Sequence, residues 1–584
     1  MTDPIRIANC SGFFGDRLSA AKEMVEGGPI DVLTGDWLAE LTMLILARTR
    51  MKRPNGGYAR TFVAQMEQVM GTCLDRGIKV VTNAGGLDPA GCAEAVAGVA
   101  DKLGLSPVIA TVDGDDLLPR MDELIAGNQL THFETGEPIK DASAFLTANA
   151  YLGCWGIVDA LDRGADIVIT GRCTDAAVVC GPAAWHHRWS RTDFDALAGA
   201  VAAGHVIECG TQATGGNYSF FKEVPGMTRI GFPWAEIAAD GSTVFGKHDG
   251  TGGEVSVGTI TSQLLYEIGG PEYFGPDVTT RFDTIELAQS GPDRVAMTGV
   301  QGEPPPSTLK VCINRPGGFR NDMSVCLTGL DIEEKAKLIE DAFWYACPFG
   351  PDDFQHVSTH LMRNDKPDPE TNEQGVAILK ISVKDPDEKK VGRAFSNSIT
   401  ELGLATIPGF FGVGGGPSAG RPFGVYEPAC VPADRVPQSV TVGNDTREVS
   451  SVIPAAEVQV TPPAEPSAGA PGGATRHAPF GLVYGTRSGD KGGNANLGVF
   501  ARSDAAWAWL DAFLTTEKLQ ELLPETAPLR VDRHRLPNLR SLNFLVHGLL
   551  EEGVAASTRQ DGQAKSLGEW LRAREVELPE ALLS

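Results

Sequence analysis

Five short apolar runs in the first 175 residues each end in a cluster of Gly, Asp, Asn or Ser. Strands buried in a parallel sheet read as continuous apolar runs, and open α/β sheets bind ligands beyond the carboxyl ends of their strands. The runs therefore predict a parallel sheet and place a ligand site at one of its edges, although they do not identify a reaction. They cover residues 5–10, 30–33, 78–81, 108–112 and 167–169.

Helical patterns separate these runs. Residues 36–49 carry leucines at the spacing of an amphipathic helix. Alternating strands and helices imply right-handed crossovers and an α/β fold with a mostly parallel, doubly wound N-terminal sheet. The remaining helical patterns cover 17–26, 61–76, 89–103, 142–163 and 194–203, and a further strand is expected at 205–209.

The alternation of strand and helix patterns ends near residue 210. Gly- and Thr-rich loops at 210–216 and 246–253 are followed by longer strand patterns at 307–314, 323–327 and 376–383 and by a helical pattern at 335–346. This mixture predicts an α+β middle subdomain. We therefore expect a large domain over 1–455, made of a sheet part (1–209) and an α+β part (210–455).

A segment rich in Pro, Ala and Gly marks the clearest boundary. Residues 460–479 read VTPPAEPSAGAPGGATRHAP, which is typical of a linker. With the linker assigned to 456–479, residues 480–584 form a small α+β domain with a predicted ferredoxin-like arrangement. Its strands are expected at 480–484, 496–500, 529–533 and 541–546, with a polar loop at 485–494.

Composition limits the class of protein. The net charge of -25 argues against nucleic acid binding, which needs Lys and Arg to neutralise phosphates. The eleven Cys contain no CxxC pair, so neither a disulfide framework nor a zinc knuckle is indicated. The chain shows no signal peptide pattern and no long apolar run, so we expect a cytoplasmic protein that does not bind membranes.

The first candidate site is the turn after the first run, with Ser11, Gly12 and Asp16. Backbone amides at such a turn can bind an anion, and Asp16 can equally be a simple helix cap. Asp36 and Glu40 stand four apart where the next helix begins, so both would project from one face. They are candidates for acid–base catalysis, and the alternative is a cap and a solvated side chain.

Two later strand ends carry the candidates for ligand binding. An arginine there can hold a carboxylate or phosphate with its planar fork, and a neighbouring aspartate can orient it or act as a base. The same two side chains can also form only an ion pair that closes a turn. The residues concerned are Asn83, Gly85 and Gly86 after one strand, and Arg172, Thr174 and Asp175 after another.

The two Gly-rich loops of the middle part add further candidates. The second loop precedes a helical pattern at 255–268, so its glycines can cradle a phosphate or a thioester oxyanion there, with His248 and Asp249 as an acid–base pair. Both loops can also be plain connections. The candidate ligand-binding residues are Thr214, Gly215 and Asn217 in the first loop, and Thr251 and Gly252 in the second.

In the last domain, Arg487 and Lys491 lie in the polar loop 485–494, which can act as an anion clamp or be a long hairpin loop. No metal site is predicted, because His356 and His360 lack a third ligand. His356 and His360 are four apart and would share one face of a helix. We expect a small anionic substrate and, on general grounds, a homo-oligomer.

Taken together, several of these segments resemble the acyclic terpene utilisation (AtuA-like) family. The segment 8–16 and the motifs GDWLAE and TNAGG carry the resemblance, and RSGDKG resembles the small ferredoxin-like domain of such proteins. The resemblance covers nearly the whole chain. The matching segments are 8–16, 35–40, 82–86, 148–153, 170–175, 208–217 and 487–492.

The resemblance implies a role in bacterial catabolism of acyclic terpenes such as citronellol and geraniol, and of related branched-chain acyl-CoA compounds. We therefore expect an enzyme that hydrates, dehydrates, isomerises or cleaves such an acyl-CoA, with no cofactor beyond CoA as part of the substrate. The family carries no established catalytic set to transfer. Two alternatives stay open, a non-catalytic assembly or binding component of a catabolic complex and a phosphoester hydrolase.

Overall fold

The computed structural model describes residues 2–53, 56–414 and 416–583. Within these ranges, the N-terminal part is built on an eleven-stranded mixed sheet. Its centre is parallel, in the order β1 (Ile5–Asn9), β2 (Val32–Gly35), β3 (Lys79–Thr82), β7 (Ile167–Thr170) and β4 (Ile109–Asp113). The five apolar runs thus form the predicted parallel core.

Antiparallel strands extend this core on both sides. Beyond β1 the sheet continues through β8 (Pro233–Ile237), β9 (Thr243–Lys247), β13 (Arg294–Thr298) and β12 (Glu286–Gly291). Beyond β4 it continues through β20 (Gln438–Val442) and β21 (Asp445–Val449). The sheet is therefore mixed, with the parallel strands shielded from its edges.

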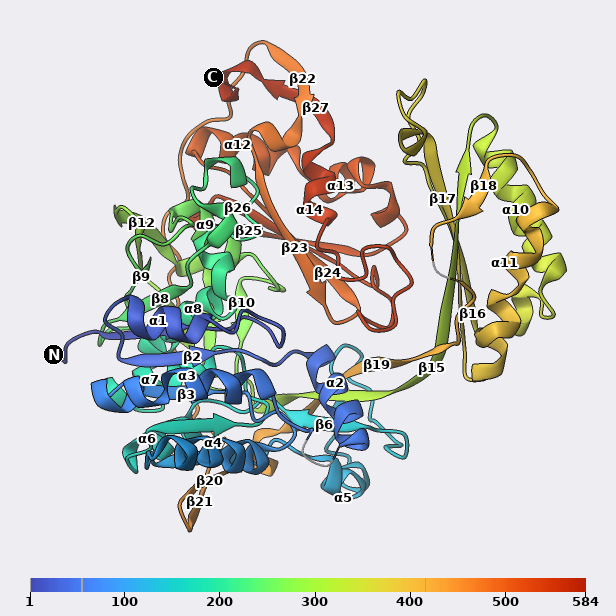
Figure 1. Ribbon diagram of the computed structural model, residues 1–584. Coiled ribbons are helices and arrows are strands. Elements are labelled where there is room, and N and C mark those ends of the chain that lie inside the picture. Colours follow the sequence, from blue (N-terminus) through green and yellow to red (C-terminus); the bar gives the residue numbers. More distant parts are fainter. Residues whose placement is uncertain (1, 54–55, 415, 584) are drawn as a thin grey trace. The chain divides into compact units, whose positions relative to one another are not determined.

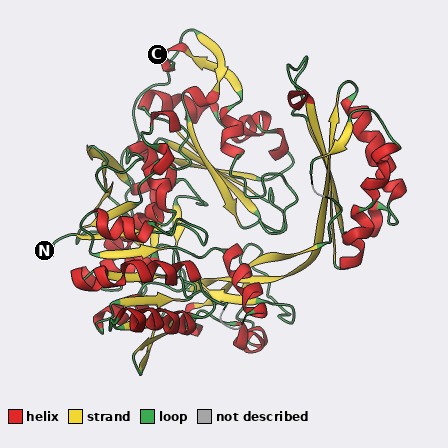
Figure 2. Ribbon diagram, viewed as in Figure 1, coloured by secondary structure: helices red, strands yellow, loops and turns green. Residues whose placement is uncertain are grey.

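Helices cover both faces of the sheet (Figures 1 and 2). One layer holds α1 (Ala20–Gly27), α3 (Arg60–Arg76) and α4 (Pro89–Leu103), whose buried residues form one core cluster with the sheet. The other layer holds α6 (Trp155–Asp162), α7 (Ala177–His187) and α8 (Phe194–Ile207). Helix α4 matches the predicted range, α3 begins one residue earlier, and each ends at a glycine in the left-handed region.

Two local predictions are wrong. Residues 142–163 do not form one helix, because 147–150 form strand β6 (Thr147–Ala150), which pairs with a later strand before α6 begins. Residues 205–207 are not a strand, because α8 continues through them. Almost every side chain of α8 is buried, so the sequence shows no amphipathic period that could separate a buried helix from a strand.

The middle sheet is antiparallel and has one very long strand. The predicted strands 307–314 and 323–327 are parts of β15 (Thr308–Thr328). Strands β16 (His356–Met362), β17 (Val376–Asp385) and β18 (Phe410–Gly412) lie in the same sheet, as do β19 (Arg421–Pro432) and β5 (Thr131–His132). Helix α10 (Ile332–Ala346) packs on β17, and His356 and His360 lie on a strand instead of a helix.

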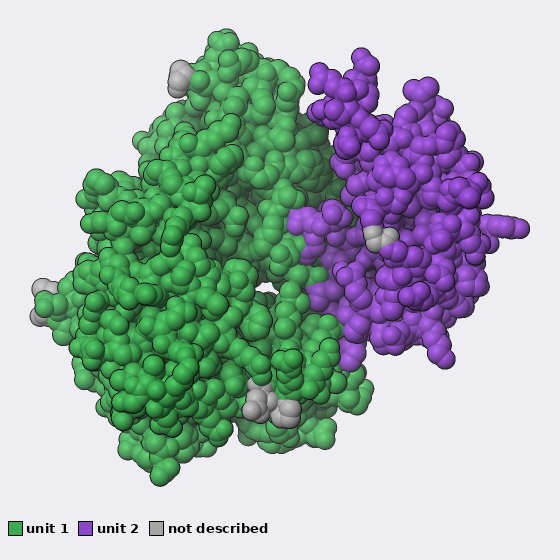
Figure 3. Space-filling view, in the orientation of Figure 1, with its two compact units in different colours: residues 1–314, 426–554, 563–584 green, residues 315–425, 555–562 purple. Residues whose placement is uncertain are grey.

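The described chain divides into two compact units (Figure 3). One comprises residues 1–314, 426–554 and 563–584, and the other comprises 315–425 and 555–562. The first unit contains both the N-terminal sheet and the C-terminal domain. The boundaries predicted at 210, 455 and 480 stay predictions.

The C-terminal domain has the predicted ferredoxin-like α+β character. Its sheet has the order β23 (Gly485–Lys491), β24 (Asn494–Phe500), β26 (Ser541–Val546) and β25 (Val531–Leu536). Helices α12 (Asp504–Phe513), α13 (Thr516–Leu522) and α14 (Leu567–Arg572) belong to the domain, and β22 (Thr475–Pro479) pairs with β27 (Glu575–Pro579).

The segment 485–491 is an edge strand, so the prediction of a loop there is wrong. The predicted strand 480–484 instead contains the short 3₁₀ turn Phe480–Leu482. The polar composition of β23 concealed a strand because its side chains contact another part of the chain instead of water, as described below. Elsewhere, across the described ranges, we find no helix with both the length and the hydropathy needed to cross a membrane.

Candidate functional site

Asp36 and Asn83 meet where β2 and β3 end. Asn83 Nδ2 donates to Asp36 Oδ1 at 2.5 Å, and Asn83 Oδ1 accepts from the backbone N–H of Trp37 at 2.9 Å. Both side chains are buried, with Asp36 only 7% exposed. Burial, together with the negative charge of Asp175, raises the pKa of Asp36, and the positive charge of Arg172 opposes this shift. Asp36 is therefore suited to hold a proton.

Arg172 and Asp175 form an ion pair at the end of β7. Arg172 Nη1 lies 2.6 Å from Asp175 Oδ1, and the Arg172 side chain is 2% exposed. The guanidinium stacks over the ring of Tyr151 at 4.2 Å. Its Nε has no hydrogen-bond partner among the described residues. The backbone N–H of Arg172 donates to Asp115 Oδ2 at 2.9 Å, which fixes the loop.

Glu40 is held by two neighbours. Tyr151 donates its O–H to Glu40 Oε1 at 2.7 Å, and Lys310 Nζ lies 3.5 Å from the same oxygen. Burial alone would raise the pKa of Glu40, but the charges of Lys310 and Arg172 and the Tyr151 hydrogen bond lower it to about 2. The Glu40 side chain stays 31% exposed. Glu40 is thus ionised at neutral pH and accessible to water.

Glu208, which follows α8, joins this group. It is 5% exposed, its Oε1 lies 3.2 Å from His205 Nδ1, and its Oε2 has no hydrogen-bond partner among the described residues. Burial raises the pKa of Glu208, and the charges of Asp175 and Glu267 raise it further. The backbone carbonyl of Glu208 accepts from Asn9 Nδ2 at 3.3 Å, which ties the end of α8 to β1.

The C-terminal domain contributes cations to the same region. Lys491 Nζ donates to the backbone carbonyl of Glu267 at 2.6 Å. Arg487 donates to Gln212 and stacks over the ring of Tyr266 at 4.1 Å. Burial raises the pKa of Glu267 to about 8, with the charges of Asp490 and Glu40 adding to the shift. The charges of Lys491 and Glu267 both affect the pKa of Glu208, which links the C-terminal cations to the strand-end group.

The predicted turn after β1 lies beside Asp36 and is fixed by contacts with backbone groups. The carbonyl of Ser11 accepts from the backbone N–H of Asp36 at 2.8 Å. A Cβ at Gly12 would lie 2.5 Å from the carbonyl carbon of Cys209, so glycine is required for this close approach. Asp16 accepts from the N–H of Gly12 at 2.8 Å and so closes the turn. Helix α1 begins at Ala20 with Ser19 at its N-cap, so Asp16 does not cap it.

Several predicted glycines and threonines serve backbone packing. A Cβ at Gly85 would lie 2.5 Å from the carbonyl oxygen of Thr170. Thr214 donates its O–H to the Gly231 carbonyl at 2.7 Å, and Thr174 donates its N–H to the Leu152 carbonyl at 2.9 Å. Among the predicted site residues, three have a positive φ angle, in the left-handed region: Gly86, Gly215 and Asn217.

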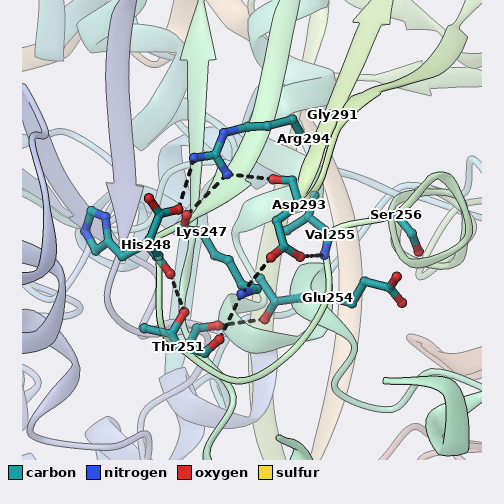
Figure 4. A network of polar contacts seen from close by, with 12 residues as sticks. Lys247, His248, Thr251, Glu254, Val255, Ser256, Gly291, Asp293 and Arg294 are labelled. Atoms are coloured by element: carbon teal, nitrogen blue, oxygen red, sulfur yellow. Dashed lines mark hydrogen bonds and ion pairs between the residues drawn. The ribbon is translucent and has the colours of Figure 1, made fainter. Parts of the chain in front are cut away.

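The second Gly-rich loop belongs to a separate network, shown in Figure 4. Lys247 pairs with Asp293 at 2.9 Å and donates to the Thr251 carbonyl at 2.8 Å. Thr251 in turn donates its O–H to the His248 carbonyl at 2.7 Å. The loop is thus fixed by its own contacts.

The other predicted residues of this loop also have partners elsewhere. His248 Nε2 lies 2.9 Å from the carbonyl oxygen of Met24. Asp249 is 99% exposed and pairs only loosely, at 3.7 Å, with Arg294. A Cβ at Gly252 would lie 2.3 Å from the Gly226 carbonyl oxygen, so the backbone at Gly226 fills the space beside Gly252. Among the contacts of the described residues, none joins these three to Asp36 or Arg172.

The structure adds site residues that the sequence analysis did not select. Tyr151 and Glu208 lie in the segments that carried the family resemblance, so that resemblance was an available signal for both. Lys310 and Glu267 had no local signal, because they reach the site only through the pairing of distant segments. Within the described ranges, no group of three or more His, Cys, Asp or Glu side chains is arranged to hold a metal ion.

Comparison with known proteins identifies two matches. Residues 5–442 match the family model described as acyclic terpene utilisation family protein AtuA. Residues 482–577 match the model of the AtuA ferredoxin-like domain. The resemblance noted in the sequence is thereby confirmed, and no curated protein and no solved structure matches the chain.

Proposed function

Because the chain belongs to the acyclic terpene utilisation family AtuA, we propose that it is a catabolic enzyme acting on a branched-chain or terpenoid-derived acyl-CoA. Membership implies a role in acyclic terpene utilisation, and the reaction is our inference. The observation that carries it is Asp36, a buried carboxyl group whose pKa is raised by burial and by the charge of Asp175 beside Arg172. Hydration, dehydration, isomerisation and cleavage of an acyl chain all require proton transfer.

Asp36 is the proton donor in this proposal, and Asp175 is the proton acceptor. Glu40, with a pKa of about 2, is too weak a base for this step and instead orients Tyr151. His248 and Asp249 have no part, because their contacts lie in the network of Lys247 and Asp293.

The test is turnover of CoA thioesters of linear and branched, saturated and unsaturated acids, including the citronellyl and geranyl chains. Asp36→Asn preserves the shape of the protonated side chain, so the variant should fold. We expect its kcat to fall by a factor of about 100 or more, as for loss of a general acid. The matched control is Asp434→Asn, since the Asp434 side chain is 64% exposed.

Three results would contradict the proposal. Turnover of every thioester by Asp36→Asn at the wild-type rate would exclude Asp36 as proton donor. Thermal stabilisation by a partner protein, with no response to thioesters, would favour an assembly component. Stabilisation by phosphate with Mg²⁺, with no dependence on the acyl chain, would favour a phosphoester hydrolase.

A further inference from the structure

The cations around the site differ in what neutralises them. Three of them face carboxylates: Arg172 pairs with Asp175 at 2.6 Å, Lys310 lies 3.5 Å from Glu40, and Lys565 lies 3.5 Å from Asp490. Their charges are therefore already compensated within the protein.

Arg487 and Lys491 have only neutral partners among the described residues. Arg487 contacts the amide oxygen of Gln212 and the ring of Tyr266. Lys491 contacts the backbone carbonyl of Glu267. The Arg487 side chain is also nearly inaccessible, because the residue is 6% exposed. These two positive charges lie within the protein without a paired carboxylate.

Strand β23 directs both cations to one side. Side chains two apart in a strand share a face, so Arg487, Gly489 and Lys491 point the same way. All three contact one short segment, since a Cβ at Gly489 would lie 2.4 Å from the Tyr266 ring. The absence of a side chain at Gly489 lets the edge strand approach this segment closely.

A buried cation without a counter-ion is costly, and a guanidinium does not deprotonate to avoid that cost. An anion held by the two groups would remove it. We propose, resting on the proposed function, that Arg487 and Lys491 hold a carboxylate or phosphoryl group of the substrate, and that Arg172 does not. The ferredoxin-like domain is then part of the substrate site.

The protonation of nearby carboxyl groups agrees with this assignment. Glu267 belongs to the segment that β23 contacts, but its carboxyl group faces Lys565, whose Nζ lies 3.8 Å from Oε1, and burial raises its pKa to about 8. At neutral pH it is mostly uncharged, so it cannot neutralise both cations. Glu208 has a raised pKa for the same primary reason, burial.

The test measures binding of small anions to the full-length protein by calorimetry and thermal shift. The probes are 3-methylcrotonate, inorganic phosphate and 3-methylcrotonamide, the neutral analogue of the first. We expect one of the two anions to bind and the amide not to bind. In Lys491→Gln and Arg487→Gln, the Kd for the anion that binds the wild type should rise about tenfold or more, which corresponds to about 1.4 kcal/mol.

The control variants are Arg172→Lys, Arg487→Lys and Arg447→Gln. The Arg447 side chain is 57% exposed, so Arg447→Gln tests for a nonspecific effect of charge. Arg172→Lys should bind the anion within about threefold of the wild type, and Arg487→Lys should retain part of the affinity because its charge remains. Preference for 3-methylcrotonate over phosphate identifies a carboxylate as the ligand group, and the reverse identifies a phosphoryl group.

Unchanged anion affinity in both Gln variants, or a loss confined to Arg172→Lys, would overturn the inference. Failure of wild type to bind either anion would overturn it as well. The proposed function fails separately, if the wild type turns over no acyl-CoA. Circular dichroism checks whether Arg487→Gln is folded. If it is unfolded, the anion affinity of Lys491→Gln, at a less buried position, decides whether the inference holds.

Discussion

Asp36 and Glu40 show how far surroundings decide the chemistry of a side chain. They lie four residues apart, and burial acts on both, yet their pKa values move in opposite directions. Glu40 gains Lys310 and a Tyr151 hydrogen bond, whereas Asp36 faces the negative charge of Asp175. The pKa of Glu40 is thus lowered to about 2 and that of Asp36 is raised, a division that spacing alone could not predict.

The lowered pKa of Glu40 predicts a pH-dependent contribution to stability. A carboxyl group with a folded pKa below its unfolded value stabilises the protein above the unfolded pKa, and this contribution disappears as pH falls through the folded pKa. The window runs from about pH 4.5 down to about pH 2. Glu40→Gln should therefore lower the free energy of unfolding at pH 7, by about 1–2 kcal/mol after allowance for solvent screening.

Urea unfolding at a series of pH values measures this effect. The difference between wild type and Glu40→Gln should shrink steadily below pH 4.5. Glu448→Gln, at an exposed position, serves as the control and should show no such trend. A difference that is independent of pH would refute the electrostatic explanation.

At the scale of elements, close backbone contacts hold the site loops together. The loop after β1 packs against the turn after α8 at Gly12 and Cys209, and the loop after β3 packs against the end of β7 at Gly85 and Thr170. In each case the space for a Cβ is filled by backbone atoms of the other loop. The strand-end loops are thus rigidly packed supports for Asp36 and Asn83.

Gly12→Ala should destabilise the protein by about 1–3 kcal/mol, because overpacking against backbone cannot be relieved by a side-chain rotation. The comparison is Gly98→Ala in α4, where nothing lies within 4 Å of the new Cβ. That change should stabilise the helix by about 0.5–1 kcal/mol. Thermal denaturation of the two variants should shift in opposite directions, and equal shifts would falsify the packing argument.

Long, periodic helices and apolar strands could be predicted from the sequence, as α3, α4 and the five parallel strands show. Segments whose pattern depends on distant partners could not. Strand β23 is polar because its side chains meet Tyr266 and Glu267, and the buried helix α8 has no polar face. For the site, the strand-end rule identified Asp36, Asn83 and Arg172, whereas Lys310 required knowledge of β15.

At the scale of the whole molecule, direct contacts join the two parts of the chain that match family models, 5–442 and 482–577. Asn496 Oδ1 accepts from the N–H of Glu267 at 2.8 Å, and Asn543 donates to the Gly269 carbonyl at 2.6 Å. Phe500 stacks with Tyr218 at 6.2 Å. The C-terminal domain thus shares a compact unit with the N-terminal sheet.

Cutting the predicted linker should therefore leave these two parts of the chain associated. A protease site inserted within residues 463–470, which form no helix or strand, would allow a single cut after folding. The cut protein should elute as one particle in size-exclusion chromatography at micromolar concentration and keep its anion affinity. An uncut sample carrying the same insertion is the control, and separation into two fragments would contradict the expectation.

The position of Lys491 and Lys565 late in the chain has a consequence for synthesis. Asp36 and Asn83 leave the ribosome more than 400 residues before these lysines. The strand-end group of the N-terminal sheet is therefore synthesised before the lysines of the C-terminal domain. The strand-end group and these two lysines can therefore come together only after the C-terminal domain has left the ribosome.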